Sequence, residues 1–188
     1  SSDPQQGRNA IVGMAPVLEA VQAFFDNEIA RFTREGFSPC TGSVGLIEGG
    51  TAVNIVPDTC AATFDIRTVP GQDTAATLAA LENFVRERVG ERDGYELIFD
   101  PPYHANPNFE APAGHPLVQT AWEVRDQPEA DPVAFGCDGS KLAAVGIPTL
   151  LLGPGSIEQA HTKDDFIAPT DLESGTEAYV NLARALLK

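Results

Sequence analysis

The sequence predicts a mixed α/β fold in two parts joined by a proline-rich segment. Residues 9–99 contain five segments with a regular hydrophobic pattern. In chain order, the spacing of their hydrophobic residues is helical, alternating, alternating, helical and alternating. Five prolines follow within residues 101–116, which is typical of a linker. Beyond it, an apolar run at 148–152 lies between two helical patterns. We therefore expect two domains, residues 1–107 and 108–188.

Two helices are expected in the first part. Apolar residues at helical spacing predict a helix over residues 9–31, in which Pro16 should cause a kink or a later start. A second apolar stripe predicts a helix over residues 74–89. Asp73, just before it, is a suitable N-cap, because its carboxylate can accept hydrogen bonds from the first free backbone amides.

Three strands accompany these helices. The first is expected at 42–48, and the second begins near Val53, pauses at Pro57 and resumes over 60–67, where apolar and polar residues alternate. The third is expected at 95–99. The resulting order lacks only an initial strand to form a ferredoxin-like βαββαβ unit. We therefore expect that the first strand of this unit is missing from the chain.

The second part is expected to combine helices with one buried strand. A helix should begin at Pro116, because proline suits the first helical position. A short helix at 138–145 should end at Gly146, and the run 148–152 fits a strand buried on both faces of a parallel sheet. The last helix should open with a capping box at 170–173 and run to the C-terminus. Its apolar stripe consists of Leu172, Tyr179, Ala183 and Leu186.

Charge and composition exclude several classes of partner. The 188 residues include 12 Lys and Arg against 27 Asp and Glu, a net charge of -15. Such a surface repels phosphates, so we expect neither nucleic-acid binding nor binding to membranes. No apolar run approaches the roughly 20 residues that span a bilayer. The three cysteines are widely spaced and lack a CxxC pair, which fits free thiols in a cytoplasmic protein.

The loop GPGSIEQAHTKDD at 153–165 is the strongest candidate for chemistry. In open α/β sheets, ligands bind beyond the carboxyl ends of strands, and glycines let the backbone approach a ligand closely. His161 in this loop is a candidate metal ligand, and Asp164 or Asp165 could orient its second ring nitrogen. The alternative is a surface loop with an ordinary histidine.

Three other potentially reactive side chains have weaker support. His104 and His115 lie in the proline-rich segment and are expected to be solvated. With His161 they lack any local spacing such as HxxxH, and a zinc site needs three or four ligands. Cys137 precedes a helix start that could stabilise a thiolate, but no base is evident to activate it.

Two polar residues of the first part could bind a substrate. Arg67 could hold a carboxylate in bidentate fashion, although an exposed pair with Asp65 on the same strand face explains it equally well. Asn54 is by default a turn or strand-end residue.

Four stretches of the sequence resemble one known family. They are SSDPQQGRNAI at 1–11, GGTAVNIVPDTCAATFDIRTVPG at 49–71, GCDGSKLAAVGIPTLLLGPG at 136–155 and GSIEQAHTKDDF at 155–166. In this order they are similar to the C-terminal half of M20-type metallohydrolases, the group of acetylornithine deacetylase, succinyl-diaminopimelate desuccinylase and glutamate carboxypeptidase. The first and last stretches together resemble the acetylornithine deacetylase branch most.

The resemblance implies an aminopeptidase-like α/β/α catalytic domain with an inserted lid domain that usually dimerises. Residues 1–107 would be the lid, and 108–188 the C-terminal segment of the catalytic domain. In this family two zinc (or cobalt) ions share a bridging carboxylate and activate a water. The N-terminal half, which this chain lacks, supplies most of the metal ligands and the glutamate base.

The resemblance also assigns roles to single residues. His161 matches the family's final metal-ligand histidine. Asn54 and Arg67 match lid residues that contact the amide oxygen or carboxylate of the substrate. The family also has a loop that lines the substrate pocket, and this loop is matched here by Gly153, Pro154 and Gly155.

The chain departs from the family pattern at three points. The lid histidine of the family would fall one residue before Ser1, and Asp165 stands where the family usually has glutamate. The HxD motif and the paired glutamates are absent from the sequence. We therefore assign no catalytic residue, and expect the chain alone to be inactive.

The implied function is a metal-dependent amidohydrolase that removes an N-acyl group from an amino acid, most like acetylornithine deacetylase in arginine biosynthesis. The expected partners are a small N-acyl amino acid, a second copy bound through the lid, and the missing N-terminal half. The alternatives are a desuccinylase, a carboxypeptidase, or a dimerisation fragment without a catalytic role.

Overall fold

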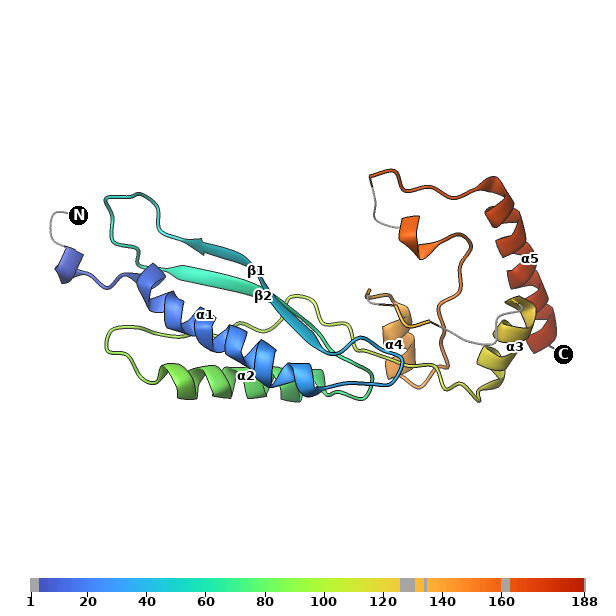
Figure 1. Cartoon of the computed structure of the whole chain (residues 1–188), viewed down its shortest axis with the longest axis horizontal. Coiled ribbons are helices and arrows are strands. Elements are labelled where there is room, and N and C mark those ends of the chain that lie inside the picture. The colour runs from blue at the N-terminus through green and yellow to red at the C-terminus, as the bar shows by residue number, and fades with distance from the viewer. Residues whose placement is uncertain (1–3, 126–130, 134, 160–162, 188) are drawn as a thin grey trace. The chain divides into compact units, whose positions relative to one another are not determined.

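The computed structural model describes residues 4–125, 131–133, 135–159 and 163–187 (Figure 1). The chain divides into two compact units, residues 1–108 and 109–188. Helices and strands both occur, which confirms the mixed α/β class. No helix in the described ranges is long and apolar enough to cross a membrane.

An antiparallel hairpin forms the sheet of the first unit. β1 (Thr41–Gly49) pairs with β2 (Cys60–Arg67), and Gly45 is an extra residue that forms a bulge in β1. Both strands are confirmed, but the expected beginning of the second near Val53 is wrong, because this segment forms turns. Pro57 has no backbone N–H to donate to a ladder, which fits the late start of β2.

Two helices run side by side along the hairpin (Figure 1). α1 (Ala10–Asn27) begins after Asn9, whose side-chain oxygen accepts a hydrogen bond of 3.1 Å from a backbone amide one turn on. α2 (Thr74–Val89) begins after Asp73, whose carboxylate accepts in the same way at 3.0 Å. The predicted N-cap of α2 is therefore confirmed. Pro16 lies inside α1, so the expected later start is wrong.

Both helices contribute to one hydrophobic core. The ring of Phe24 in α1 meets that of Phe84 in α2 edge-on, with 5.5 Å between centroids. Phe25 meets Phe64 of β2 in the same way at 6.0 Å. The buried members of the core are Ala20, Val21, Phe24, Phe25, Ile29, Cys40, Val69, Leu81 and Val85. Full burial of each large apolar side chain contributes about 1.5–3 kcal/mol, so this core is the main source of stability of the unit.

Residues 95–99 do not form the predicted strand. Leu97 and Phe99 pack against the core, whereas Ile98 between them is 67% exposed. The alternation therefore predicted correctly which side chains face inward. The described residues form a sheet of β1 and β2 only, and a segment becomes a strand only beside a partner that pairs with its backbone.

Contacts distant in sequence fasten this segment to the start of α1. The hydroxyl of Tyr95 donates to the carbonyl of Asn9 at 3.3 Å, and its ring packs against Gly13, where a Cβ would collide with it. An ion pair of 2.8 Å joins Arg8 and Asp93 next to these residues.

Two of the predicted helices of the second unit are confirmed. α3 (Pro116–Arg125) begins at the proline, and α4 (Gly139–Ala144) lies within the expected range. Gly146 ends α4 with a φ of 81°. Its amide and that of Ile147 donate back to the carbonyls of Ala143 and Leu142, the paired hydrogen bonds that typically terminate a helix at glycine.

The beginning of the last helix differs from the prediction. α5 (Pro169–Leu186) starts after Ala168, which makes no side-chain cap, and Pro169 takes the first helical position. The capping box at 170–173 is therefore wrong. The predicted apolar stripe is also largely exposed, at 51% for Leu172 and 41% for Leu186.

The apolar run 148–152 is not a strand, and Leu151 is 45% exposed. The prediction of a strand buried on both faces is wrong for the described structure. A central parallel strand needs a neighbour on each side, and the part of the second unit that the structure describes contains no other strand.

Candidate functional site

The glycine-containing loop borders an open pocket of about 370 Å³ in the second unit. Pro154 and Gly155 line it, whereas Gly153 is not among its lining residues. Gly155 has a φ of 81°, a conformation that residues with a Cβ rarely adopt. The other lining residues are Ser156, Asp165, Phe166 and Ile167.

The pocket offers both polar and apolar contacts. Around Gly155, backbone atoms can approach a ligand without an intervening side chain. Phe166 is 63% exposed and provides an apolar surface, and Asp165 adds a carboxylate. A small ligand with one apolar and one polar end would match this combination.

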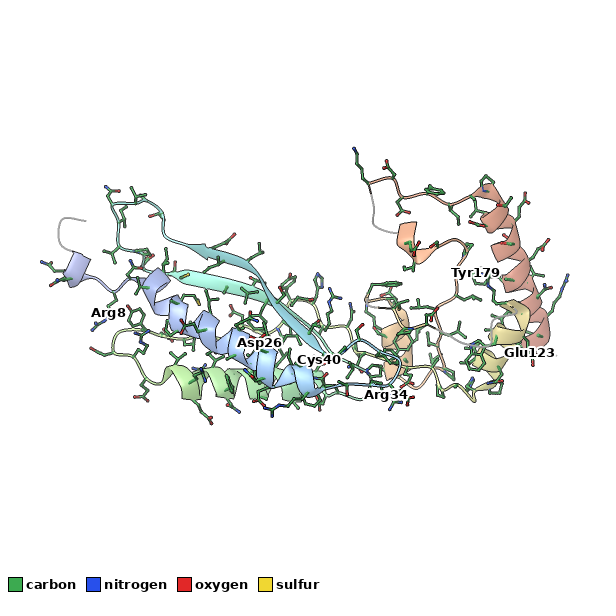
Figure 2. The ribbon with its side chains drawn as sticks, viewed as in Figure 1. Arg8, Asp26, Arg34, Cys40, Glu123 and Tyr179 are labelled. Carbon is green, nitrogen blue, oxygen red and sulfur yellow. The ribbon has the colours of Figure 1, made fainter. Side chains whose placement is uncertain are left out.

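Two contacts from α5 hold this loop. The hydroxyl of Tyr179, labelled in Figure 2, donates a hydrogen bond to the carbonyl of Leu152. Gly175 lies against the ring of Pro154. The sequence pattern reveals neither role, because Tyr179 falls on the apolar stripe of the helix and no local signal marks Gly175.

His161, the predicted metal ligand, lies outside the described residues. Asp164 and Asp165, which follow it in the chain, are both exposed. Among the residues that the structure describes, no three His, Cys, Asp or Glu side chains gather to hold a metal ion. Because zinc needs three or four protein ligands, the described residues do not fit a zinc site on their own.

Arg67 and Asn54 lie at different places on the hairpin of the first unit. Arg67 Nε donates to Asp65 Oδ2 at 2.6 Å, and both side chains are more than half exposed. Such a pair contributes at most about 1 kcal/mol. Because Thr41 pairs with Arg67 and Gly49 with Cys60, Arg67 lies at the open end of the hairpin.

Asn54 lies in the connection at the opposite end of the hairpin. The seven residue steps from Cys60 to Arg67 span roughly 23 Å, at about 3.3 Å per step. The structure therefore does not bring Asn54 and Arg67 together around one small molecule.

The other two histidines, His104 and His115, each contact a neighbouring residue in the chain. The ring of His104 lies 4.9 Å from that of Tyr103, and both residues are exposed. His115 is half-buried, and its Nδ1 accepts a hydrogen bond of 3.2 Å from the amide of Leu117 at the start of α3. His115 thus acts as a helix cap, a role that sequence reasoning missed although it stands directly before Pro116.

Of the three cysteines, Cys40 is the most deeply buried. Burial raises the pKa of Cys40, and a smaller contribution from the Gln72 side chain opposes this shift. All three cysteines are free thiols. Asp138, next to Cys137, pairs with Lys141 at 2.7 Å; this pair lowers the pKa of Asp138 and raises that of Lys141.

The chain is similar to known proteins both in its sequence and in its fold. The family model described as the peptidase dimerisation domain of M20 proteins matches residues 1–93. Acetylornithine deacetylase from Vibrio parahaemolyticus is 34% identical over 174 residues, which cover 89% of this chain and 44% of that protein. The enzyme of the same name from Vibrio campbellii is 31% identical over 194 residues, covering 100% of this chain and 49% of that protein.

A solved structure shows the same fold. Aminopeptidase PepT from Bacillus cereus superposes with a TM-score of 0.64 at 23% identity, over 99% of this chain and 48% of that one. The chain thus spans about half the length of the relatives that it matches.

The fold and the sequence together place the chain among proteins that contain a peptidase dimerisation domain. Within that class, the chain belongs to the M20 peptidase family, and it is similar to the acetylornithine deacetylases.

Proposed function

We propose that this chain is the C-terminal half of a metal-dependent amidohydrolase that removes the N-acyl group from an amino acid, as acetylornithine deacetylase does. One observation carries the proposal: 34% identity to acetylornithine deacetylase over 89% of the chain, well beyond the first unit. The dimerisation-domain match alone, over residues 1–93, would fit a non-catalytic fragment equally well. The similarity of the second unit favours the enzyme.

In this proposal the first unit is the lid, with the ferredoxin-like arrangement. A strand that precedes Ser1 would lie between β2 and residues 95–99. This is where Leu97 and Phe99 face the core without ladder hydrogen bonds to β2. In the βαββαβ motif the first strand lies between the third and fourth, so it would provide their missing partner.

The second unit is the C-terminal segment of the catalytic domain, and the N-terminal half is its partner. Large apolar patches on a soluble protein mark surfaces that another part covers. Exposed apolar side chains are numerous in this unit, and include Leu142, Val145, Ile147, Leu151, Leu172 and Val180. A covering sheet would also pair with residues 148–152.

Substrate contacts in this chain would come from three places. Arg67 would bind the carboxylate of the amino acid, Asn54 would donate to the amide oxygen, and the loop from Gly153 to Gly155 would line the pocket. Because Asn54 and Arg67 lie at opposite ends of the hairpin, they would contact one substrate only if different copies of the lid contributed them.

The metal ions would depend on ligands from outside this chain. Two zinc or cobalt ions, which provide Lewis-acid chemistry for amide hydrolysis, are proposed for the whole enzyme. His161 would contribute one ligand. The described residues provide no further cluster, so the remaining ligands and the general base would come from the N-terminal half.

The proposal is tested by assaying the protein that contains both halves against N-acetyl-ornithine, N-succinyl-diaminopimelate and an N-acyl glutamate. We expect the highest kcat/KM with N-acetyl-ornithine. A preference for one of the other two compounds would favour the desuccinylase or carboxypeptidase alternative, and no hydrolysis of any of them would contradict the proposal.

The 188-residue chain alone provides a second test. It should show no turnover, and calorimetry should show weak zinc binding, because one imidazole cannot hold zinc tightly. Submicromolar zinc affinity of the isolated chain would contradict the proposed division of ligands.

A further inference from the structure

We propose that Gly175 and Tyr179 of α5 are positioning residues, which hold residues 152–155 in the conformation that receives the substrate. The identity of that substrate rests on the proposed function above. The positioning itself rests on two contacts that do not involve the metal or the N-terminal half.

The two contacts form one interface. Gly175 and Tyr179 are four residues apart, so they lie on the same face of α5. Their partners, the backbone carbonyl of Leu152 and the ring of Pro154, are two residues apart in a segment outside any helix. One turn of α5 thus contacts the loop at two points.

Gly175 permits this close approach. It is buried, and a Cβ added to it would lie 2.7 Å from Cβ of Pro154, nearer than real Cβ contacts allow. Within a helix, glycine is less stable than alanine, so helix formation itself disfavours a glycine at this position. Contact with Pro154 is the structural reason for glycine there.

Tyr179 fixes the second point of the loop. The carbonyl of Leu152 follows a run with no ladder partner in the described residues, and the Tyr179 hydroxyl supplies its hydrogen bond. Pro154 stands directly before Gly155, and Leu152 stands three residues before it. Gly155 lines the pocket and has the positive φ. A shift of Pro154 would therefore be transmitted to the wall of the pocket.

Hydrogen exchange on the 188-residue chain tests the positioning without any activity. In Tyr179→Phe, the amides of Leu152, Gly153, Gly155 and Ser156 should exchange about 2- to 13-fold faster, the range that corresponds to one ordinary hydrogen bond. In Gly175→Ala they should also exchange faster, and the second unit should unfold at a lower temperature. Helix propensity alone predicts the opposite sign, a higher unfolding temperature.

Matched controls are available for both changes. A Cβ added to Gly114 would meet no atom within 4 Å, so Gly114→Ala should leave the loop amides unchanged. Tyr103 is 80% exposed and lies in the first unit, so Tyr103→Phe should do the same. If Gly175→Ala raises the unfolding temperature, or if neither test variant accelerates exchange, the positioning role is overturned.

Kinetics of the protein that contains both halves tests the link to the substrate. Tyr179→Phe should raise KM for the N-acyl amino acid by about 2- to 13-fold, with kcat and metal content unchanged. Faster exchange without a change in KM would overturn the substrate-positioning role. If the protein hydrolyses no N-acyl amino acid at all, the proposed function fails, while the exchange data still decide whether α5 positions the loop.

Discussion

Changing His161 or Arg67 to alanine in the protein with both halves should impair activity in two different ways. His161→Ala removes a proposed metal ligand, so metal content and kcat should both fall. Arg67→Ala removes the proposed charge-assisted contact to the substrate carboxylate, worth roughly 1.5–3 kcal/mol, or about ten- to a hundredfold in kcat/KM. Metal analysis and steady-state kinetics measure both effects.

Arg31→Ala is the control for Arg67, since Arg31 is an exposed arginine that pairs with Glu28 at 3.2 Å. Its kinetics should match those of the unchanged protein. Full metal content and normal turnover in His161→Ala would show that His161 is not a ligand. Normal kcat/KM in Arg67→Ala would leave Arg67 as the surface partner of Asp65.

Cys40 should make the stability of the first unit depend on alkaline pH. Burial raises the pKa of its thiol in the folded state above the unfolded value of about 8.5. The stabilisation is complete below the unfolded pKa, and is lost as pH rises through the folded pKa. Between the two values the free energy of unfolding should fall by up to about 1.4 kcal/mol per pH unit from this group.

Denaturant titrations at pH 8 and pH 10 measure this dependence. Cys40→Ala should lose less stability between the two pH values than the unchanged chain does. Equal losses in the two proteins would show that Cys40 does not contribute.

The accessibility of the three thiols provides a separate measurement. Cys60 and Cys137, which are only half-buried, should react with iodoacetamide before Cys40, which is 2% exposed.

At the scale of elements, helices and turns could be predicted from the sequence because their signals are local. Asp73 caps α2, Pro116 begins α3 and Gly146 ends α4, and each acts through neighbours within a few residues. Residues 95–99 and 148–152 show the limit of such reasoning. Their composition suits strands, but a strand exists only when a partner distant in sequence pairs with it.

The candidate site shows the same limit. Family resemblance pointed to the loop from Gly153 to Gly155, and the structure finds a pocket beside Pro154 and Gly155. Gly175 and Tyr179 could not be predicted, because their role arises from one helix face lying against loop residues that are 21 and 27 positions earlier in the chain.

Two glycines of β1 should respond oppositely to substitution by alanine. A Cβ on Gly42 would collide with the ring of Phe25 in the core, whereas a Cβ on Gly45 would meet nothing within 4 Å. Gly42→Ala should destabilise the first unit by about 1–3 kcal/mol, the usual result of overpacking. Gly45→Ala should stay within about 0.5 kcal/mol, as surface changes usually do.

Thermal unfolding followed by circular dichroism compares the two variants on the same strand. Equal stability of Gly42→Ala and Gly45→Ala would mean that the ring of Phe25 moves aside freely. It would then not be held by the edge-on contact with Phe64.

At the scale of the whole molecule, the dimerisation-domain match supports a homodimer, which we propose forms through β1. Only one side of β1 is paired in the described sheet, and Leu46 and Ile47 on it are 61% and 53% exposed. An unpaired edge with apolar side chains favours association. Leu46→Asp should therefore shift the chain from dimer toward monomer in sedimentation velocity experiments.

Val12→Asp places the same charge on an equally exposed residue, 62% accessible, in the first turn of α1. It should leave the dimer intact. A monomeric unchanged chain, or equal dissociation by both variants, would contradict association through β1.

The fastening of Tyr95 to Asn9 also governs how the first unit acquires its structure during synthesis. The joined residues are 86 positions apart, and the ion pair between Arg8 and Asp93 spans 85. A ribosome adding about 5–20 residues per second needs roughly 4–17 s to make the intervening chain. Throughout that interval α1 lacks its closing contacts, and Phe24 and Phe25 have no completed core to enter. The apolar side chains of the nascent helix therefore stay exposed to unwanted association until residues 93–95 have been made.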